Sequence, residues 1–452
     1  MAQNKTCTFL LYFFLAAICL DGALKCLWAG ERNGRAPAGL RPDEVLVLAN
    51  RASDDSMEVG RHYMKTRGIP KDHIFTIQYE DFGELTPMDQ NPKWFPFDRF
   101  RDEVVEPLEQ LLEEKGWRKQ ILCFVTVYGT PYRVGGFELT EKEKTELRRK
   151  LATEETYREA SPEKKEEMFE KRRRNLWRAN SAFDSELATL FEPAPPKNAR
   201  CGYGRRQRLK GPSKNPYFGQ SIPLRTFRQQ QLADEEPGLL YMVARIDGLS
   251  AQNAKGLVDK AVKAEKEGVS GTAYFDARSE GEKKKGYGLG DWWIRRAWEI
   301  TKKAGIKTIR NTNGGMFGPG ECPDALIYWG FYHPFKYNGK IFNNSFPTGA
   351  IACHIASFEA ANIHRAKWGK EGENMPWCSG FLRDGVTVTI GPVAEPYLQA
   401  FPHTSHFFSR LYSGWSMGET YWTSIGHTSW RMILVGDPLY KPFEKRTDRS
   451  EP

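Results

Sequence analysis

The chain has 452 residues and a formal net charge of +9, and 40% of its residues are hydrophobic. This is enough apolar material for a large folded core, and the length suggests about three domains at roughly 150 residues each. A basic excess can indicate nucleic-acid binding, but acidic residues are interleaved with the basic ones along the chain. We therefore expect a solvated surface and no nucleic-acid partner.

Residues 1–29 have the pattern of a secretory signal peptide. Lys5 precedes an apolar run from Phe9 to Leu20, and small and mixed residues follow up to Gly30. A charged region, an apolar region and a cleavage zone in this order are typical of exported proteins. The apolar run is shorter than the ~20 residues of a membrane-spanning helix. We expect a periplasmic, cell-envelope or extracellular location with no membrane span after cleavage, and an uncleaved anchor is the alternative.

Strands and helices alternate over residues 43–137. The run from Val45 to Ala49 predicts a buried strand, and Ser53 or Asp54 can cap the helix after it. "HIFTIQ" predicts a second strand, residues 100–116 an amphipathic helix, and "QILCFVTVYGTPYRV" a long central strand that ends at Gly129-Thr130-Pro131. This order is typical of a parallel sheet covered by helices, and it predicts an N-terminal α/β subdomain.

Residues 138–235 interrupt the alternation. From Glu138 to about Arg178 the chain is helix-forming and highly charged, with Glu alternating with Lys through most of the segment. The loop "EPAPPKNARCGYGRRQRLKGPSKNP" follows and has no secondary-structure period. We expect a charged helical insertion followed by a long surface loop.

The alternation resumes over residues 236–445. Helices are predicted at "SAQNAKGLVDKAVKAEKEG", capped by Ser250 and ended by Gly268, and at "GDWWIRRAWEITKKAG". Strands are predicted at "GLLYMVARIDG", "GTAYFDA", "IKTIRN", "ALIYWGF", "GAIACHIASF", "VTVTIGPV" and "RMILVGDPLYKPF". The expected fold class is α/β, with mostly parallel sheets, helices on both faces and a charged helical insertion.

Polar residues leave the carboxyl ends of the predicted strands. Right-handed crossovers make parallel strands point the same way, so we expect one shared functional edge. One such residue is usually a turn or a helix cap, but several along one edge indicate a cleft. The candidate cleft residues are Arg245, Asp247, Asp276, Arg278, His354 and Glu395, with the stretch Phe331 to His333, Ser357 and Asp437 at further strand ends.

Known motifs give little support to a particular chemistry. "GYGLGD" (Gly286 to Asp291) lacks the spacing of a dinucleotide loop, and the chain has no P-loop, H-E-x-x-H or G-x-S-x-G sequence. His354 and Ser357 are three residues apart near a strand end, so they face opposite sides unless the backbone bends after His354. A buried, hydrogen-bonded His354 is the favoured interpretation.

The cysteines and acidic residues limit which cofactors can be expected. Three of the eight cysteines lie in the signal segment, and the remaining five are widely spaced and odd in number, which argues against a disulfide scaffold. Cys123 and Cys353 lie in apolar runs and are expected to be buried. No C-x-x-C pair supports a zinc site. No cofactor is expected, although Asp276, Asp291 and Glu395 are candidate oxygen ligands for a structural calcium ion.

The C-terminal half resembles the gingipain-type cysteine peptidases. "VARIDGLSAQNAKGLVDKAVKAE", "SGWSMGETYW" and "LVGDPLY" carry the resemblance, in the order that this family shares, between about Gly238 and Phe443. It implies a caspase-hemoglobinase fold, a three-layer αβα arrangement with a catalytic His at the end of one strand and a Cys at the end of the next.

The two catalytic positions differ from that family. Tyr328-Trp329-Gly330 matches the lead-in to the histidine, but Phe331 occupies the histidine position. Ser357 stands where the cysteine belongs, and Cys353 is four residues too early. A phenylalanine accepts no proton, and a serine without an adjacent base is a poor nucleophile. The resemblance therefore implies the fold and argues against the chemistry.

Most of residues 43–443 is similar to an uncharacterised family of exported bacterial proteins from species with exosortase-type sorting. The matching segments are "VLVLANRASDDSMEVGRHYMKTRGIP", "SAFDSELATL", "YFDAR", "GAIACHIASF" and "VAEPYL". This resemblance implies location and architecture, and no activity.

Three functions remain open from the sequence. The favoured one is a non-enzymatic binding or assembly component of the cell envelope, with a protein or peptide as partner. The second is a hydrolase, a peptidase or an esterase, with a rearranged site that uses His333 and either Cys353 or Ser357. The third is a carbohydrate- or peptide-binding surface around the aromatic residues Trp415, Tyr421, Trp422 and Trp430, which are more often core residues at such spacing.

Overall fold

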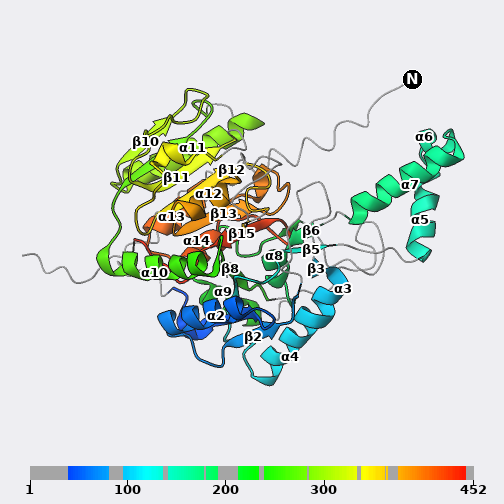
Figure 1. Cartoon of the computed structure of the whole chain (residues 1–452), viewed down its shortest axis with the longest axis horizontal. Helices are drawn as coiled ribbons and strands as arrows, with labels where there is room; N and C mark the ends of the chain where they lie inside the picture. The colour runs from blue at the N-terminus through cyan, green and yellow to red at the C-terminus, as the bar shows by residue number, and fades with distance from the viewer. Residues whose placement is uncertain are drawn as a thin grey trace, which may run out of the picture.

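The computed structural model describes residues 39–80, 95–135, 141–177, 180–191, 212–233, 239–281, 285–332, 337–361, 363–364 and 375–443, apart from the side chains of residues 98, 142, 143, 174–177 and 180. A ten-stranded sheet lies at its centre, in the order β10-β9-β11-β12-β13-β15-β8-β4-β1-β2 (Figure 1). Its strands are β1 (Val45–Asn50), β2 (Ile74–Ile77), β4 (Cys123–Val127), β8 (Met242–Ile246), β9 (Thr272–Asp276), β10 (Thr308–Asn311), β11 (Ala325–Phe331), β12 (Ile351–Ile355), β13 (Val388–Pro392) and β15 (Met432–Val435).

Helices and short strands surround this sheet. The helices are α2 (Asp54–Arg67), α3 (Phe97–Phe100), α4 (Glu106–Glu114), α5 (Glu141–Leu151), α6 (Glu155–Arg158), α7 (Pro162–Trp177), α8 (Phe183–Leu187), α9 (Leu224–Ala233), α10 (Ala251–Glu267), α11 (Tyr287–Lys303), α12 (Trp377–Arg383), α13 (Thr404–Tyr412) and α14 (Met417–Trp422), with a π-helical turn (Arg101–Val105) between α3 and α4. Two small sheets contain β3 (Phe95–Pro96), β5 (Arg133–Gly135) and β6 (Asn180–Ala182), and β7 (Ser213–Lys214) and β14 (His427–Thr428).

The predicted fold class is confirmed. Tyr328 in β11 stacks on Trp377 of α12, with ring centroids 5.7 Å apart. The next residue of the same strand, Trp329, packs against Phe407 and Phe408 of α13. Successive side chains of a strand point to opposite faces, so helices cover both faces of the sheet. This burial on both faces explains why the central strands are near-continuous apolar runs in the sequence.

The expectation that all strands point the same way is wrong. The pairs β10–β9–β11–β12–β13 are parallel, and so are β15–β8–β4–β1–β2, but β13 and β15 pair antiparallel. The sheet therefore has two parallel halves of opposite direction, and their carboxyl ends lie at opposite edges. Strands of the expected N-terminal and C-terminal subdomains, β4 and β8, pair directly within this one sheet.

Local signals in the sequence place several helix ends correctly. The Ser53 hydroxyl accepts a hydrogen bond from the Ser56 amide at the start of α2, and Ser250 does the same for Asn253 at the start of α10. The helix α10 ends at Gly268, whose φ of 86° is a conformation that favours glycine. The predicted long strand from Gln120 to Val134 is shorter, because β4 ends at Val127 and the chain then turns into the separate sheet of β5.

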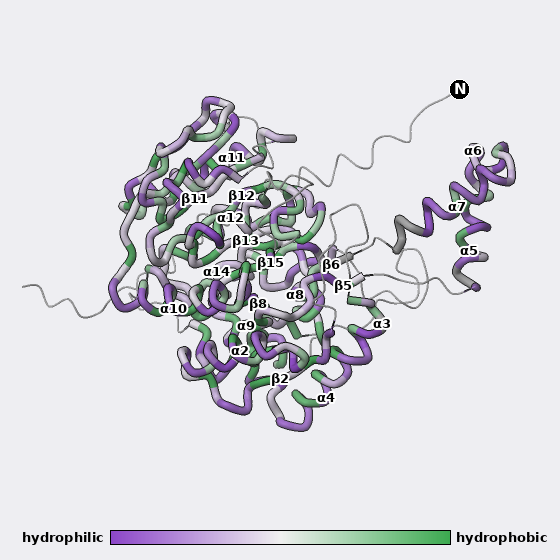
Figure 2. The backbone as a smooth tube through the Cα atoms, in the orientation of Figure 1, coloured by the Kyte–Doolittle hydropathy of each residue, from purple (hydrophilic) through white to green (hydrophobic). Residues whose placement is uncertain are grey.

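The charged insertion forms a helical hairpin. The helices α5, α6 and α7 project from the main body at one side (Figure 1), and Figure 2 shows them as mostly hydrophilic. They have a small core of their own, made of Leu147, Leu151, Tyr157 and Phe169. The predicted helical character of this segment is confirmed.

In the described part of the chain, none of the helices combines the length and apolar character of a bilayer-crossing segment.

Candidate functional site

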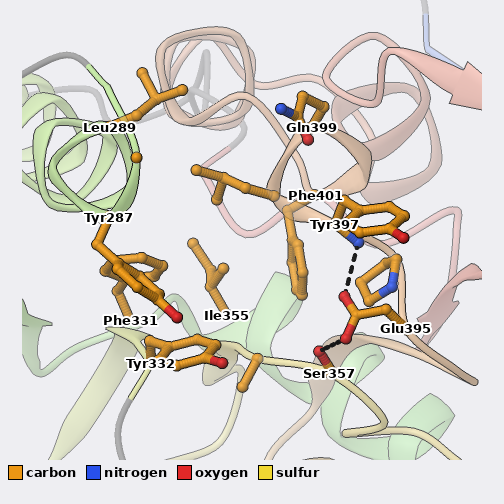
Figure 3. Close-up of a pocket in the computed structure, with 14 residues that line it drawn as sticks. Tyr287, Leu289, Phe331, Tyr332, Ile355, Ser357, Glu395, Tyr397, Gln399 and Phe401 are labelled. Carbon is orange, nitrogen blue, oxygen red and sulfur yellow. Dashed lines mark hydrogen bonds between the residues drawn. The ribbon is translucent and has the colours of Figure 1, made fainter.

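A pocket of about 360 Å³ lies at the carboxyl ends of β11, β12 and β13. Figure 3 shows Tyr287, Phe331 and Tyr332 on one side of it and Glu395, Tyr397 and Gln399 on the other, with Ile355 between them. The first group comes from the start of α11 and the end of β11, and the second from the segment after β13. The volume is at the lower end of the ~300–1,000 Å³ range of small-molecule sites.

Ser357 and Glu395 form the polar part of this pocket. The Ser357 hydroxyl donates to Glu395 Oε2 at 2.6 Å, and the backbone amide of Tyr397 donates to Glu395 Oε1 at 3.1 Å (Figure 3). Arg431 donates to the backbone carbonyl of Glu395. These hydrogen bonds hold the Glu395 carboxylate in place, with the Ser357 hydroxyl directed at it. The two residues are brought together from two of the predicted strand ends.

Phe331, at the position where the gingipain resemblance implies a histidine, is part of the packing. Its ring lies 3% exposed against Gly290 in the first turn of α11. A Cβ at Gly290 would overlap this ring, so the absence of a side chain there makes room for the phenylalanine. β11 and β12 are neighbouring parallel strands with Phe331 beside Ile355. The two positions where the resemblance implies a histidine and a cysteine therefore adjoin the pocket, but one of them holds an apolar ring.

The other proposed reactive residues are placed as follows. Cys353 lies within β12 and is fully buried, and burial raises the pKa of its thiol well above the ordinary value. A buried thiol of this kind is not a thiolate at neutral pH. His333 lies outside the described residues. Of the proposed nucleophiles, only Ser357 lines the pocket.

His354 has a structural environment. It is fully buried, its Nδ1 lies 2.9 Å from Glu359 Oε1, and its ring stacks on Trp377 with centroids 4.2 Å apart. This is the buried, hydrogen-bonded arrangement that the sequence favours. β12 ends at Ile355, and Ser357 lines the pocket while His354 lies beneath Trp377. His354 and Ser357 therefore do not converge.

Three segments that line the pocket contain strained backbone. Tyr332 after β11, Phe358 beside Ser357, and Tyr397 after Glu395 have φ values of 53°, 65° and 61°. Non-glycine residues rarely adopt this conformation, and it costs about 1–3 kcal/mol where it occurs. Such residues are enriched at ligand-binding and active sites, and three of the seven in the described part of the chain lie in segments that line this pocket.

Arg245 and Asp247 lie at the opposite edge of the sheet, which corrects the expectation of one shared edge. The Arg245 guanidinium bonds to Asp184 at 2.5 Å and to Asp247 at 3.1 Å, and all three side chains are buried. His364 Nε2 lies 2.8 Å from Asp247 Oδ1. Burial raises the pKa of Asp247, but His364 and Arg245 outweigh that effect and hold it below the ordinary value. The cluster is a buried ion-pair network, apart from the pocket.

Asp437, the last predicted strand end, is also structural. It follows β15, in the half of the sheet that contains β8. It accepts hydrogen bonds from the Tyr63 hydroxyl at 3.0 Å and from the Arg67 guanidinium, both on α2. Asp437 thus fastens α2 to the end of β15.

The three candidate calcium ligands are not gathered at one site. Asp276 accepts bonds from Tyr328 and Asn311, whereas Asp291 accepts from the Arg278 amide and Ser279, and Glu395 lies in the pocket. Among the described residues no group of three or more His, Cys, Asp or Glu side chains could hold a metal ion. Asp276 therefore links the end of β9 to β11 and to the end of β10, and Asp291, within α11, holds the turn after β9.

Arg278 lies beside the pocket through its aromatic contacts. Its guanidinium carbon is 4.8 Å from the Tyr287 ring centroid and 6.0 Å from that of Tyr332. Of the candidate cleft residues, Glu395 lines the pocket and Arg278 adjoins it through two residues that do.

Of the three tyrosines of the pocket, the sequence identified only Tyr332, which belongs to the stretch Phe331 to His333. Tyr287, Tyr332 and Tyr397 are 56%, 40% and 65% exposed, and they are three of the five large hydrophobic residues that are exposed in the described part of the chain. Tyr287 belongs to the "GYGLGD" stretch, which forms the start of α11. By contrast, the aromatic residues considered for a binding surface are core: Trp415, Tyr421 and Trp422 are at most 2% exposed, and Trp430 is partly buried against the core.

No protein-family model matches the chain, and no curated protein matches it either. Two solved structures have some likeness to it. One is described as "Structure of Protease" (9% identity, TM-score 0.38, covering 89% of this chain and 79% of the other). The second is the complex of the pro- and mature domains of RgpB from Porphyromonas gingivalis (9% identity, TM-score 0.40, covering 88% of this chain and 79% of the other). At this identity and these TM-scores neither likeness carries an argument about activity, and the fold class rests on the sheet and helices described above.

Proposed function

We propose that the protein is an exported binding component of the cell envelope, and that the pocket at the ends of β11, β12 and β13 holds its ligand without hydrolysing it. The observation that supports this most strongly is Phe331 at the position where the gingipain resemblance implies the base; its ring packs on Gly290 in the pocket that Ser357 also lines. General base catalysis needs a proton acceptor within hydrogen-bond reach of the nucleophile. The Phe331 ring has no atom that accepts a proton, whereas the pocket still offers space for a ligand.

A second candidate is a hydrolase with Ser357 as nucleophile. It is favoured by the 2.6 Å hydrogen bond from Ser357 to Glu395, because a carboxylate can act as a general base. The bond of the Tyr397 amide to the same carboxylate argues for a fixed structural pair instead. His333 belongs to this second candidate as an alternative base.

Turnover assays of the purified full chain distinguish the two candidates. Peptide and ester libraries are incubated with the wild-type protein and with the Ser357→Ala and His333→Ala variants. The binding function predicts that all three give the same product profile as a protein-free blank. Turnover by the wild type that is lost in Ser357→Ala would establish the hydrolase instead. His62→Ala, which changes a partly exposed histidine paired with Asp259 on the surface, serves as the matched control for histidine replacement.

A further inference from the structure

The mouth of the pocket is aromatic and exposed to solvent. Tyr287 and Tyr332 lie with ring centroids 5.0 Å apart, and Tyr397 stands across the pocket from them (Figure 3). Exposing three tyrosine rings around one cavity leaves apolar surface in water that a ligand could cover. A tyrosine offers an apolar face and a hydroxyl at its edge, so it suits a ligand that is itself apolar on one face and polar at its rim.

The charges around the pocket do not favour a charged ligand. Among the described residues that line it, Glu395 is the only charged one. Both of its carboxylate oxygens already accept hydrogen bonds, and the guanidinium of Arg431 contacts its backbone. Arg278 stands against the outer side of the tyrosine pair. An anion would be repelled by Glu395, and Arg278, which already occupies the tyrosine pair, would repel a cation there, so a neutral ligand fits best.

The polar groups of the pocket suit hydroxyl groups. Ser357 can both donate and accept, Glu395 accepts, and Gln399 offers an amide that does both. A ligand with several hydroxyl groups can bond to the remaining lone pairs of Ser357 and Glu395 and to the Gln399 amide, whereas a purely apolar ligand would use none of these groups.

An extended peptide finds no strand to pair with at this place. Peptides that bind along a sheet add a strand to an exposed edge. The pocket lies at the ends of β11, β12 and β13, each of which is paired on both sides within the sheet. Recognition here must therefore come from the aromatic faces and the polar rim, and not from backbone pairing.

From the aromatic mouth, the balance of charge and the hydroxyl-binding groups, we infer that the pocket binds a neutral saccharide unit. The inference rests on the proposed binding function and names its ligand class. The C–H face of a pyranose ring packs on Tyr287 or Tyr397, and its hydroxyl groups bond to Ser357, Glu395 and Gln399.

The test is a binding titration with defined neutral hexasaccharides. The full chain is titrated calorimetrically with cellohexaose, hexa-N-acetylchitohexaose and mannohexaose, and in parallel with a library of neutral hexapeptides. We expect binding of at least one hexasaccharide, weakened at least about tenfold in Tyr287→Ala and in Tyr397→Ala, the loss of roughly one aromatic stacking contact. Ile309→Ala is the matched control, because Ile309 is 39% exposed on the edge strand β10 and does not line the pocket.

Each outcome separates the ligand class from the binding function. Saccharide binding that depends on both tyrosines and not on Ile309 supports the inference. Binding of a peptide, with the same dependence on Tyr397 and no saccharide binding, overturns the ligand class and leaves the binding function standing. Binding of neither class contradicts both. Equal thermal stability of the three variants excludes misfolding as the cause of any loss.

Discussion

Arg245 is fully buried and shares its guanidinium between two buried carboxylates, Asp184 and Asp247. It also donates to the backbone carbonyls of Thr130 and Pro131, which follow β4. One side chain thus ties β8 to the chain after β4 and to α8. Its role is structural, although the sequence pattern alone placed it in a cleft.

Replacing Arg245 by methionine should be strongly destabilising. The substitution leaves Asp184 buried without its cation and leaves Asp247 with His364 alone, and breaking a buried ion pair in this way typically costs about 3–5 kcal/mol. The free energy of unfolding, measured by denaturant titration, should fall by that order. The control is Arg99→Met, which removes an ion pair that is 44% and 39% exposed and should change stability by about 0.2–1 kcal/mol. Equal effects of the two changes would contradict the structural role of Arg245.

Two partly buried histidines, His403 just before α13 and His406 within it, predict acid sensitivity. Burial lowers the pKa of His403 to about 4 and that of His406 to about 3, and Arg296 and Arg410 add to the effect. In the unfolded chain a histidine pKa is about 6.5, so the unfolded state binds more protons as the pH falls below that value. The stability should be constant with respect to these groups above about pH 7 and should fall as the pH is lowered from about 6.5 to about 4.

Thermal unfolding measured from pH 8 to pH 4 checks this prediction. The double variant His403→Asn/His406→Asn should lose part of the acid-induced fall in melting temperature, whereas His62→Asn, at a 31% exposed site, should retain it. An unchanged slope in the double variant would show that other groups carry the acid sensitivity.

At the scale of elements, α11 and β11 fit together only because Gly290 has no side chain. Gly290→Ala should destabilise the protein by about 1–3 kcal/mol, since the new methyl group overlaps the Phe331 ring. Gly256→Ala is the matched control: it lies within α10, and nothing lies within 4 Å of its Cβ position. There alanine should be neutral or stabilising by about 0.5–1 kcal/mol. Chemical denaturation of both variants, and of Gly290→Ala combined with Phe331→Leu as a rescue, gives the comparison.

The helical hairpin should be dispensable for the stability of the main body. Gly135 at the end of β5 pairs with Asn180 at the start of β6, so the ends of the insertion are adjacent. The core of α5, α6 and α7 is separate from the other two hydrophobic clusters. Replacing residues 136–179 by a short turn should shift the main melting temperature by no more than about 2 °C. A fall of many degrees would mean that the hairpin supports the main body.

At the scale of the whole molecule, the strands could be predicted from the sequence but their directions could not. The apolar runs around Val45, Cys353 and Met432 each form a strand, since burial on both faces demands a continuous apolar run. Such a run has no direction, and the long connection from β13 to β15 permits either orientation. The antiparallel pairing of β13 with β15 therefore went unpredicted, and with it the separation of Arg245 and Asp247 from the pocket.

The candidate site was predicted in part. Ser357 and Glu395 were identified as strand ends, and the structure brings them together in one pocket. Tyr287 and Tyr397 were missed, because a tyrosine in the sequence carries no sign of whether it is buried, and most are. A glutamate-proline-tyrosine sequence after a predicted strand was the available signal, and exposure can only be known once the surrounding elements are placed.

The central claim is that the pocket at the ends of β11, β12 and β13 contains no activated nucleophile. Covalent labelling tests this claim most directly. The full chain is treated at neutral pH with a fluorophosphonate for activated serines and with iodoacetamide for thiolates, and the modified residues are mapped by mass spectrometry. Glu395→Gln is treated in parallel. We predict no labelling of Ser357 or Cys353 in the folded protein, and labelling of Cys353 only after denaturation. Stoichiometric fluorophosphonate labelling of Ser357 that is lost in Glu395→Gln would contradict the claim and establish the Ser357–Glu395 pair as catalytic.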